Sequence, residues 1–359
     1  MHITRTIVGV LAVGALAAAL DAYVVFHGSS YQDVLYDSAA SADDIISVAG
    51  APAGVARAGD GSVLLTFSIS DGEGEDEKGA WRLLDAHGKV VRSAKASAYN
   101  EPIGFDDGFV LVEGSSETSS TRIALDGSTK AAGKPEPSTP VRAGDILLPD
   151  PQAWIFYRPS DGSVHEVPPP GRHTRSGAFE SVAIDEDGTI WGVTDRARRT
   201  FRLVHSADGG RTWATETRVY SKLGAPDDLI ASHGVTFLSF IDASDMEDIF
   251  IEGMIVMDGG TPRPFTPDGV SLRRLDHLAT DVLPDGRLVL GLDAERGPAG
   301  WLVATTPAND TFRPMKVPAK TSDVREAGGA LYAWVGDGGD LRQSLDAGAT
   351  WTEIDIGGR

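Results

Sequence analysis

One eight-residue motif occurs twice in the second half of this chain of 359 residues. Both copies fit the pattern S-x-D-x-G-x-T-W at every fixed position, which chance alone would rarely produce. The first copy consists of Ser206, Asp208, Gly210, Thr212 and Trp213, and the second of Ser344, Asp346, Gly348, Thr350 and Trp351. Because one local structure is encoded twice, the pair indicates a chain built from repeated units.

Each copy carries the residues of a fastened turn. The Asp carboxylate can accept backbone N–H groups of its own loop, and the Gly two residues later can take a positive φ. The Ser and Thr hydroxyls can form hydrogen bonds within the same loop. The Trp then begins a strand and offers a large apolar face for packing. The motif therefore predicts a β-hairpin turn.

This pattern resembles the Asp-box, also called the bacterial neuraminidase repeat, of sialidase-like β-propellers. In that family the box turns join the third and fourth strands of a blade, on the face opposite the ligand site. The resemblance implies an all-β propeller of four-stranded blades. It also implies that Asp208 and Asp346 are structural and not catalytic.

A wider repeat supports a propeller. Seven units each contain a turn followed by a short β-rich run, and successive turns lie 37 to 52 residues apart, about the length of a four-stranded blade. Each unit then places a second strand and a polar turn at an equivalent position. The first turns are Asp60-Gly61, Asp107-Gly108, Gly144-Asp145, Asp187-Gly188, His233-Gly234, Asp285-Gly286 and Gly328-Gly329.

One small sheet cannot bury both of its faces alone, so these units are expected to stack and close into a ring. The sequence predicts a seven-bladed β-propeller over residues 54–359. A β-sandwich with Gly-rich turns is the alternative all-β fold, but it does not explain the two sets of equivalent turns.

The first 53 residues differ from the repeats. Residues 1–27 contain an apolar stretch from Ile7 to Phe26, interrupted only by Asp21 and long enough to span a bilayer. This stretch predicts an export signal or a membrane anchor. A cleaved signal and an uncleaved anchor both fit. Residues 28–53 are expected to be a linker, in which Ile45–Val48 is a candidate strand that closes the ring by pairing with the last blade.

Composition excludes several functions. The net charge of −20 argues against a nucleic-acid partner, because phosphate binding needs a basic surface. The absence of Cys excludes disulfides, thiolate catalysis and Cys-based metal sites. The acidic segment Asp71–Glu77 lacks the residue order of an EF-hand loop, and we assign no metal and no cofactor.

Arginines give the best indication of a ligand. Arg side chains suit carboxylate or phosphate groups, and several lie in loops between units or between second and third strands. Ordinary surface arginines are the alternative reading. The candidate ligand-binding residues are Arg172, Arg175, Arg196, Arg198, Arg274 and Arg325.

A sialidase active site is not complete in this sequence. The family resemblance requires three arginines on the substrate carboxylate, an Asp acid/base and a Tyr–Glu nucleophile pair. The nearest match to the family's first Arg motif is Tyr157-Arg158-Pro159, which lacks the Ile and lies in mid-chain. It also adjoins a box-like turn, which would place Arg158 near the wrong face. We assign no catalytic residue.

The sequence thus favours an exported propeller, secreted or anchored through its N-terminal segment, which would be its only membrane contact. We expect a monomer that acts as a binding or assembly platform for a protein or glycan partner, with no nucleic acid. In this it resembles non-catalytic Asp-box propellers of the sortilin and photosystem-assembly types. The alternative function is a glycoside hydrolase of sialidase type.

Overall fold

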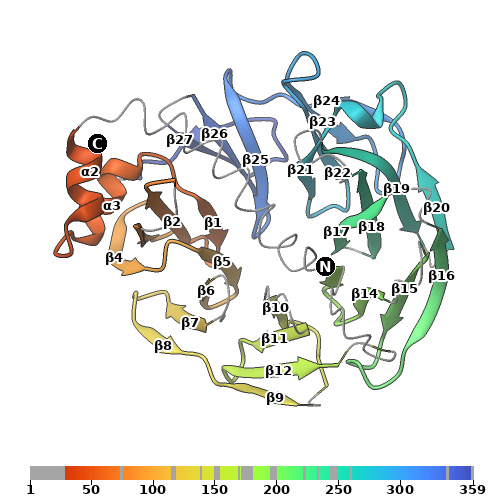
Figure 1. The fold of residues 1–359 in the computed structure, drawn as a ribbon, viewed down its shortest axis with the longest axis horizontal. Helices are drawn as coiled ribbons and strands as arrows, with labels where there is room; N and C mark the ends of the chain where they lie inside the picture. Colours follow the sequence, from red (N-terminus) through yellow and green to blue (C-terminus); the bar gives the residue numbers. More distant parts are fainter. Residues whose placement is uncertain are drawn as a thin grey trace, which may run out of the picture.

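Seven four-stranded sheets surround a central axis (Figure 1). The predicted seven-bladed β-propeller is therefore confirmed. The computed structural model describes residues 29–72, 76–114, 119–137, 140–148, 154–168, 170, 181–194, 200–220, 224–232, 234–242, 249–258, 261–336 and 339–356.

Six blades follow chain order from the inner to the outer strand through antiparallel pairs. Blade 1 comprises β1 (Gly54–Arg57), β2 (Val63–Ser70), β3 (Glu77–Leu84) and β4 (Val90–Ala96). Blade 2 comprises β5 (Asn100–Phe105), β6 (Gly108–Glu113), β7 (Ser119–Ala124) and β8 (Thr129–Ala131). Blade 4 comprises β13 (Ser181–Ile184), β14 (Ile190–Thr194), β15 (Thr200–Ser206) and β16 (Ala214–Tyr220).

The last three blades have the same order. Blade 5 comprises β17 (Ala225–Ser232), β18 (Val235–Asp242), β19 (Phe250–Asp258) and β20 (Thr261–Phe265). Blade 6 follows the short 3-10 helix η2 (Leu272–Arg274) and comprises β21 (Leu275–Val282), β22 (Leu288–Leu292), β23 (Gly300–Ala304) and β24 (Phe312–Pro314). Blade 7 comprises β25 (Thr321–Ala327), β26 (Ala330–Val335), β27 (Asp340–Ser344) and β28 (Thr352–Glu353).

Blade 3 departs from this order. Its sheet runs β10 (Ile146–Leu148), β11 (Trp154–Arg158), β12 (Ser163–Val167) and then β9 (Pro135–Pro137). The outer strand β9 precedes the others in sequence and pairs with β12 in parallel. Its two prolines lack N–H donors, which restricts such a strand to the edge of a sheet.

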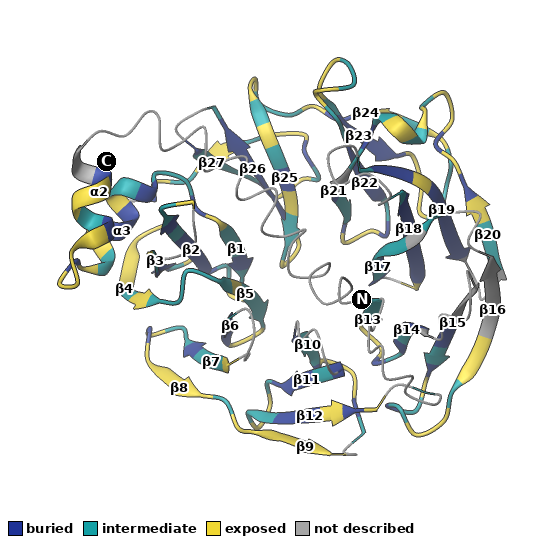
Figure 2. Ribbon diagram, viewed as in Figure 1, coloured by how far each residue is buried: buried dark blue, intermediate teal, exposed yellow. Residues whose placement is uncertain are grey.

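The apolar core lies between neighbouring blades. In β18 seven of the eight residues are buried, because both faces of this strand are covered. Phe237 packs in a cluster shared with blade 6, whereas the next residue, Leu238, packs in a cluster shared with blade 4. The outermost strands β8 and β9 are exposed (Figure 2). Burial on both faces explains the uninterrupted apolar runs in the middle strands.

The expected closing strand at Ile45–Val48 is wrong, because these residues lie in a helix. Residues 29–49, placed in the expected linker, form α2 (Ser29–Tyr36) and α3 (Ala42–Ala49). Ser41 and Asp44 form a reciprocal capping box at the start of α3. Ile45, Ile46 and Ala49 then form one buried face. The cap and the helical spacing outweigh the preference of β-branched residues for strands.

These two helices, which we call the helical clasp, cover the junction between the first and last blades. Ile45 and Ile46 join one apolar cluster with Phe67 of blade 1 and with Tyr332 and Trp334 of blade 7. In Figure 1 the clasp lies outside blade 1. Each of these two blades consists of strands from its own contiguous segment. No exchanged strand therefore closes the ring in the described residues, and apolar packing takes its place.

Hydrogen bonds reinforce the same junction. The Arg82 side chain is 5% exposed, and it donates to the Ile356 carbonyl at 2.6 Å and to the Asp43 carboxylate at 2.6 Å. The Trp334 indole donates to the Pro52 carbonyl at 2.7 Å. Arg82 thus connects blade 1 to the clasp and to the segment that follows blade 7.

Replacing Arg82 tests this junction. We expect Arg82→Ala to lower the free energy of unfolding by about 1–3 kcal/mol, because the buried Ile356 carbonyl loses its donor. Urea unfolding followed by far-UV circular dichroism measures the change. The control Arg313→Ala, at an exposed position of β24, should change the free energy by less than about 1 kcal/mol. Equal effects of the two substitutions would contradict the role given to Arg82.

Candidate functional site

The first S-x-D-x-G-x-T-W motif forms a closed set of hydrogen bonds between β15 and β16. The Ser206 hydroxyl donates to the Asp208 carboxylate at 2.8 Å and accepts the Gly210 N–H at 2.8 Å. Asp208 also accepts the N–H of Thr212 at 2.8 Å and its hydroxyl at 2.6 Å. Gly210 has a φ of 89°, which favours glycine.

The second motif repeats this geometry between β27 and β28. Ser344 donates to Asp346 at 2.8 Å, and Asp346 accepts from the backbone and the hydroxyl of Thr350 at 2.8 and 2.6 Å. Gly348 donates to the Ser344 hydroxyl at 2.9 Å. In each motif, hydrogen bonds from the Thr hydroxyl and backbone lower the pKa of the Asp carboxyl to about 2.

The tryptophan of each motif contacts the preceding blade. Trp213 packs against Trp154 of blade 3, with ring centroids 5.4 Å apart. The Trp351 indole donates to the carbonyl of Lys316, which follows the last strand of blade 6, at 2.9 Å. The two turns therefore fasten blade 4 to blade 3 and blade 7 to blade 6. The Ser, Asp and Thr side chains of both motifs are engaged within the turns themselves.

The contribution of the second turn to stability can be tested through its dependence on pH. We expect Asp346→Ala to lower the melting temperature at neutral pH, because the turn loses three acceptor contacts. The pKa of Asp346 is depressed to about 2, so its contribution is complete above the unfolded value and is lost as the pH falls from about 4 to about 2. Differential scanning calorimetry across this range measures the change.

The control for this substitution is Leu345→Ala in the same turn, where the side chain is 66% exposed. It should leave the melting temperature nearly unchanged. A deficit of Asp346→Ala that persists at pH 2, or one no larger than that of the control, would contradict the assigned fastening role.

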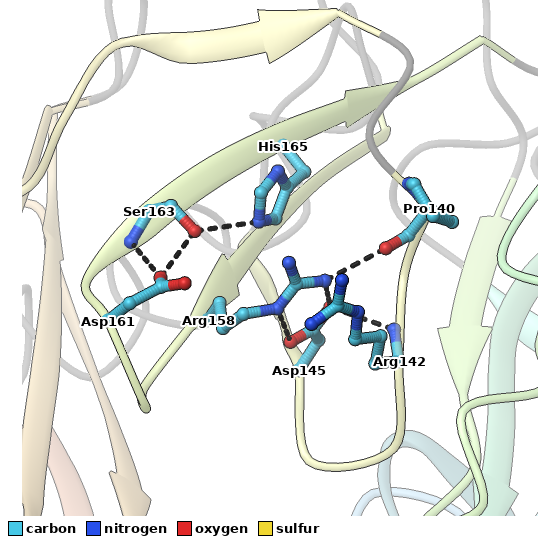
Figure 3. Close-up of polar contacts among 7 residues, drawn as sticks. All are labelled: Pro140, Arg142, Asp145, Arg158, Asp161, Ser163 and His165. Atoms are coloured by element: carbon cyan, nitrogen blue, oxygen red, sulfur yellow. Dashed lines mark hydrogen bonds and ion pairs between the residues drawn. The ribbon is translucent and has the colours of Figure 1, made fainter.

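Arg158 of the Tyr157-Arg158-Pro159 match is held inside blade 3 (Figure 3). Its guanidinium donates twice to the Asp145 carboxylate, at 2.9 and 2.7 Å, and once to the Pro140 carbonyl at 2.8 Å. Both Arg158 and Asp145 are nearly fully buried. The hydrogen bonds that Arg158 donates to the Asp145 carboxylate raise the pKa of Arg158. This guanidinium joins two turns of one blade and is not presented to a ligand.

The turn after Arg158 occupies the position of a box. Ser163 donates its N–H to Asp161 at 2.9 Å, and its hydroxyl lies 2.8 Å from the His165 ring nitrogen Nε2. Burial lowers the pKa of His165, which favours the neutral ring. These hydrogen bonds stabilise the turn between β11 and β12. We give His165 no catalytic role.

The six candidate arginines do not form one described cluster. Arg172, Arg175, Arg196 and Arg198 lie outside the described residues. Arg274, in η2, donates to the Pro298 carbonyl at 2.8 Å. Arg325, in β25, pairs with Asp323 at 2.9 Å. The two described guanidinium groups therefore contact different loops and strands and do not form a shared clamp.

Arg325 lines a cavity of about 250 Å³ between the inner strands of blades 5, 6 and 7. These strands are β17, β21 and β25, and each contributes at least one charged side chain. The lining residues are Asp228, Ile230, Ala279, Thr280, Asp281, Val324 and Arg325. Of the candidate arginines in the described residues, Arg325 is the one that reaches this cavity, which we call the central cavity.

A second hollow, of about 510 Å³, lies at the turn between β23 and β24. It is open to solvent, and its charged groups already satisfy one another. Arg263 pairs with Asp310 at 2.7 Å, and Thr311 donates to Asp268 at 3.1 Å. We therefore assign the candidate site to the central cavity, where charged groups from three blades meet.

The carboxyls of the central cavity have different partners. Asp281 accepts the Val282 N–H at 2.8 Å and the Glu326 N–H at 2.5 Å, and so joins blade 6 to blade 7. The Asp228 carboxyl has no hydrogen-bond donor among the described residues. The Thr280 hydroxyl is buried and also lacks a partner there.

Burial changes the acidity of this region. It raises the pKa of Asp228 and of Asp281 to about 7, and that of Asp227 to about 6. It also raises the pKa of Glu101 in β5. Desolvation alone would lower the pKa of Arg325, but the carboxylates of Asp323, Asp281 and Glu101 outweigh it and raise that pKa.

Clustered perturbed acids of this kind are typical of functional sites. At neutral pH the central cavity contains partly ionised carboxyls beside one guanidinium whose side chain is 57% exposed. Such a set can bind hydrogen-bond donors and exchange protons. In the described residues no three His, Asp or Glu side chains are arranged to hold a metal ion.

Sequence reasoning found Arg325 but missed the acids. Fifty-two Asp and Glu residues give no pattern until the inner strands are known. A signal was nevertheless present, because Asp228, Asp281 and Arg325 each lie shortly before the first turn of a unit. In the structure these positions fall on the inner strands β17, β21 and β25, which line the central cavity.

No membrane-spanning helix occurs among the described residues. The apolar segment at residues 1–27 lies outside them, so the predicted signal or anchor stays a prediction.

Comparisons with known proteins support the fold. No family model matches the chain, and no curated protein matches it. The acylaminoacyl peptidase of Pyrococcus horikoshii aligns over 84% of this chain and 52% of its own, with 9% identity and a TM-score of 0.50. This chain thus spans about half of that peptidase.

Two further structures are more distant. The β-propeller domain of the Trilobed protease from Pyrococcus furiosus aligns over 84% of this chain and 82% of its own, with 9% identity and a TM-score of 0.38. An oligogalacturonate lyase in complex with manganese aligns over 83% and 76%, with 13% identity and a TM-score of 0.37. A propeller fold does not by itself decide between an enzyme and a binding module, because one fold can carry many different functions. These structures give no support to a sialidase activity, and the Asp-box resemblance rests on the two motifs.

Proposed function

We propose that this chain is an exported β-propeller that serves as a binding or assembly platform for a protein or glycan partner outside the cytoplasm. In this proposal residues 1–27 direct export, and the propeller is either secreted or anchored through them. The central cavity receives a group of the partner. The observation that carries the proposal is the meeting of Asp228, Asp281 and Arg325 at one cavity on the axis of the ring.

The contacts of the other polar groups favour binding over sialidase catalysis. Asp208 and Asp346 are saturated by their own turns. Arg158 is committed to Asp145, and Arg274 and Arg325 have separate partners. No described group of arginines is arranged to clamp a substrate carboxylate. A ring of stacked sheets instead presents a rigid site with little reorganisation on binding.

The charge of the chain limits the partner. With a net charge of −20, the surface repels phosphate backbones, so the proposal excludes nucleic acid. An acidic platform suits a partner that offers hydrogen-bond donors or basic groups.

The platform proposal is tested with arrays of glycans and of surface-protein peptides, probed with the labelled full chain. We expect saturable binding to a defined set of ligands. Asp228→Asn should weaken this binding about tenfold, because a charge-assisted contact at the cavity is lost. The control Asp33→Asn, at an exposed position of α2, should bind like the unchanged chain.

Two results would contradict the platform proposal. One is the absence of any saturable ligand on either array. The other is turnover of a fluorogenic sialoside that Arg325→Ala abolishes, since this would establish a sialidase. Melting temperatures of all variants show that each is folded.

A further inference from the structure

We propose that the central cavity binds a basic group of a protein partner, the guanidinium of an Arg or the ammonium of a Lys, with the Asp228 carboxyl as its main acceptor. This inference rests on the proposed platform function and gives it a ligand class. It differs from the expectation that Arg325 marks a site for carboxylate or phosphate groups.

Two unsatisfied polar groups face the same cavity. The Asp228 carboxyl of β17 is half-buried, lines the cavity and has no hydrogen-bond donor among the described residues. The Thr280 hydroxyl of β21, the inner strand of the next blade, is buried and unpartnered as well. Leaving such acceptors without a donor is unfavourable. A ligand with several N–H donors would satisfy both, because a guanidinium carries five and an ammonium three.

The balance of charge favours a cation. Five carboxyls influence the region, from β17, β21, β25 and from β5 in blade 2: Asp227, Asp228, Asp281, Asp323 and Glu101. The adjoining strand β13 contributes no ionisable side chain. Arg325 is the opposing cation, and its Nε atom is committed to Asp323 at 2.9 Å. The field of this site is therefore negative, and an anionic ligand would be repelled.

The size of the cavity favours an organic cation over a bare metal ion. A volume of about 250 Å³ holds a side chain. In the described residues no three carboxyl or imidazole groups are arranged as metal ligands. A basic side chain projecting from a partner protein satisfies the charge, the donors and the volume together, whereas a neutral glycan satisfies only the donors.

A cationic ligand makes binding depend on pH. Burial raises the pKa of Asp228 and of Asp281 to about 7, so these carboxyls are partly protonated at neutral pH. A bound cation favours the ionised carboxylate and lowers its pKa. Binding should therefore release protons near pH 7 and should strengthen as the pH rises from 6 to 8.

Isothermal titration calorimetry of the full chain tests this inference with three blocked tripeptides that differ in the central residue. The probes are acetyl-Gly-Arg-Gly-amide, acetyl-Gly-Lys-Gly-amide and the neutral acetyl-Gly-Gln-Gly-amide. We expect the Arg and Lys peptides to bind about tenfold tighter than the Gln peptide at pH 8 and to weaken several-fold at pH 6. Titrations at pH 7 in two buffers of different ionisation enthalpy should show proton release.

Two substitutions are expected to change the affinity for the Arg peptide in opposite directions. Asp228→Asn should weaken the Arg peptide about tenfold, because the acceptor charge is lost. Arg325→Ala should strengthen it, because a repelling cation is removed. Asp33→Asn should have no effect. A role of Asp228 that is merely structural would lower the melting temperature and would not produce this reversal of sign.

Other outcomes overturn the inference. Equal affinity for the Gln and Arg peptides would do so. Weaker binding of the Arg peptide by Arg325→Ala would also do so, as would an affinity for this peptide that does not change between pH 6 and pH 8. If the arrays yield saturable ligands that carry no basic group and Asp228→Asn leaves them unaffected, the basic-ligand inference fails and the platform proposal stands. If the arrays yield no ligand, the platform proposal itself fails.

Discussion

The contact between blades 1 and 7 is the constraint on which the ring depends. Each sheet has two apolar faces, so the first and last sheets must cover each other or leave one face in water. Each is built from its own contiguous segment, and the helical clasp supplies the apolar surface that an exchanged strand would otherwise provide. Arg82 and Trp334 add hydrogen bonds that reach across this junction.

Closure of the ring also creates the central cavity. Asp228, Asp281 and Arg325 belong to three different blades and meet only because their inner strands surround one axis. The same closure partly shields the two carboxyls from water and raises their pKa values. Keeping the Asp228 carboxyl without a hydrogen-bond donor at this position opposes folding, and acids with perturbed pKa values are common at binding sites. Asp281 offsets part of the free-energy cost of burying its own carboxyl by accepting two backbone N–H groups.

The sequence predicted what is encoded locally. The two S-x-D-x-G-x-T-W turns and the spacing of the units were sufficient for a seven-bladed propeller. At Ile45–Val48 the β-branched residues indicate a strand, whereas the capping pair Ser41–Asp44 favours the helix that forms. The parallel strand β9 pairs with residues about 30 positions away, and short-range patterns do not record such pairing. The cavity acids were missed for a related reason, since which side chains face the axis depends on ring closure.

The most direct measurement is a carbon-13 NMR titration of the Asp and Glu carboxyl groups of the full chain. The resonances of Asp228 and Asp281 would be assigned through Asp228→Asn and Asp281→Asn. Because the two groups interact, they are expected to titrate as a pair, with both transitions near pH 7, and each substitution should remove one of them. Titration of both carboxyls at the ordinary value near pH 4 would contradict an enclosed acidic cavity formed by ring closure.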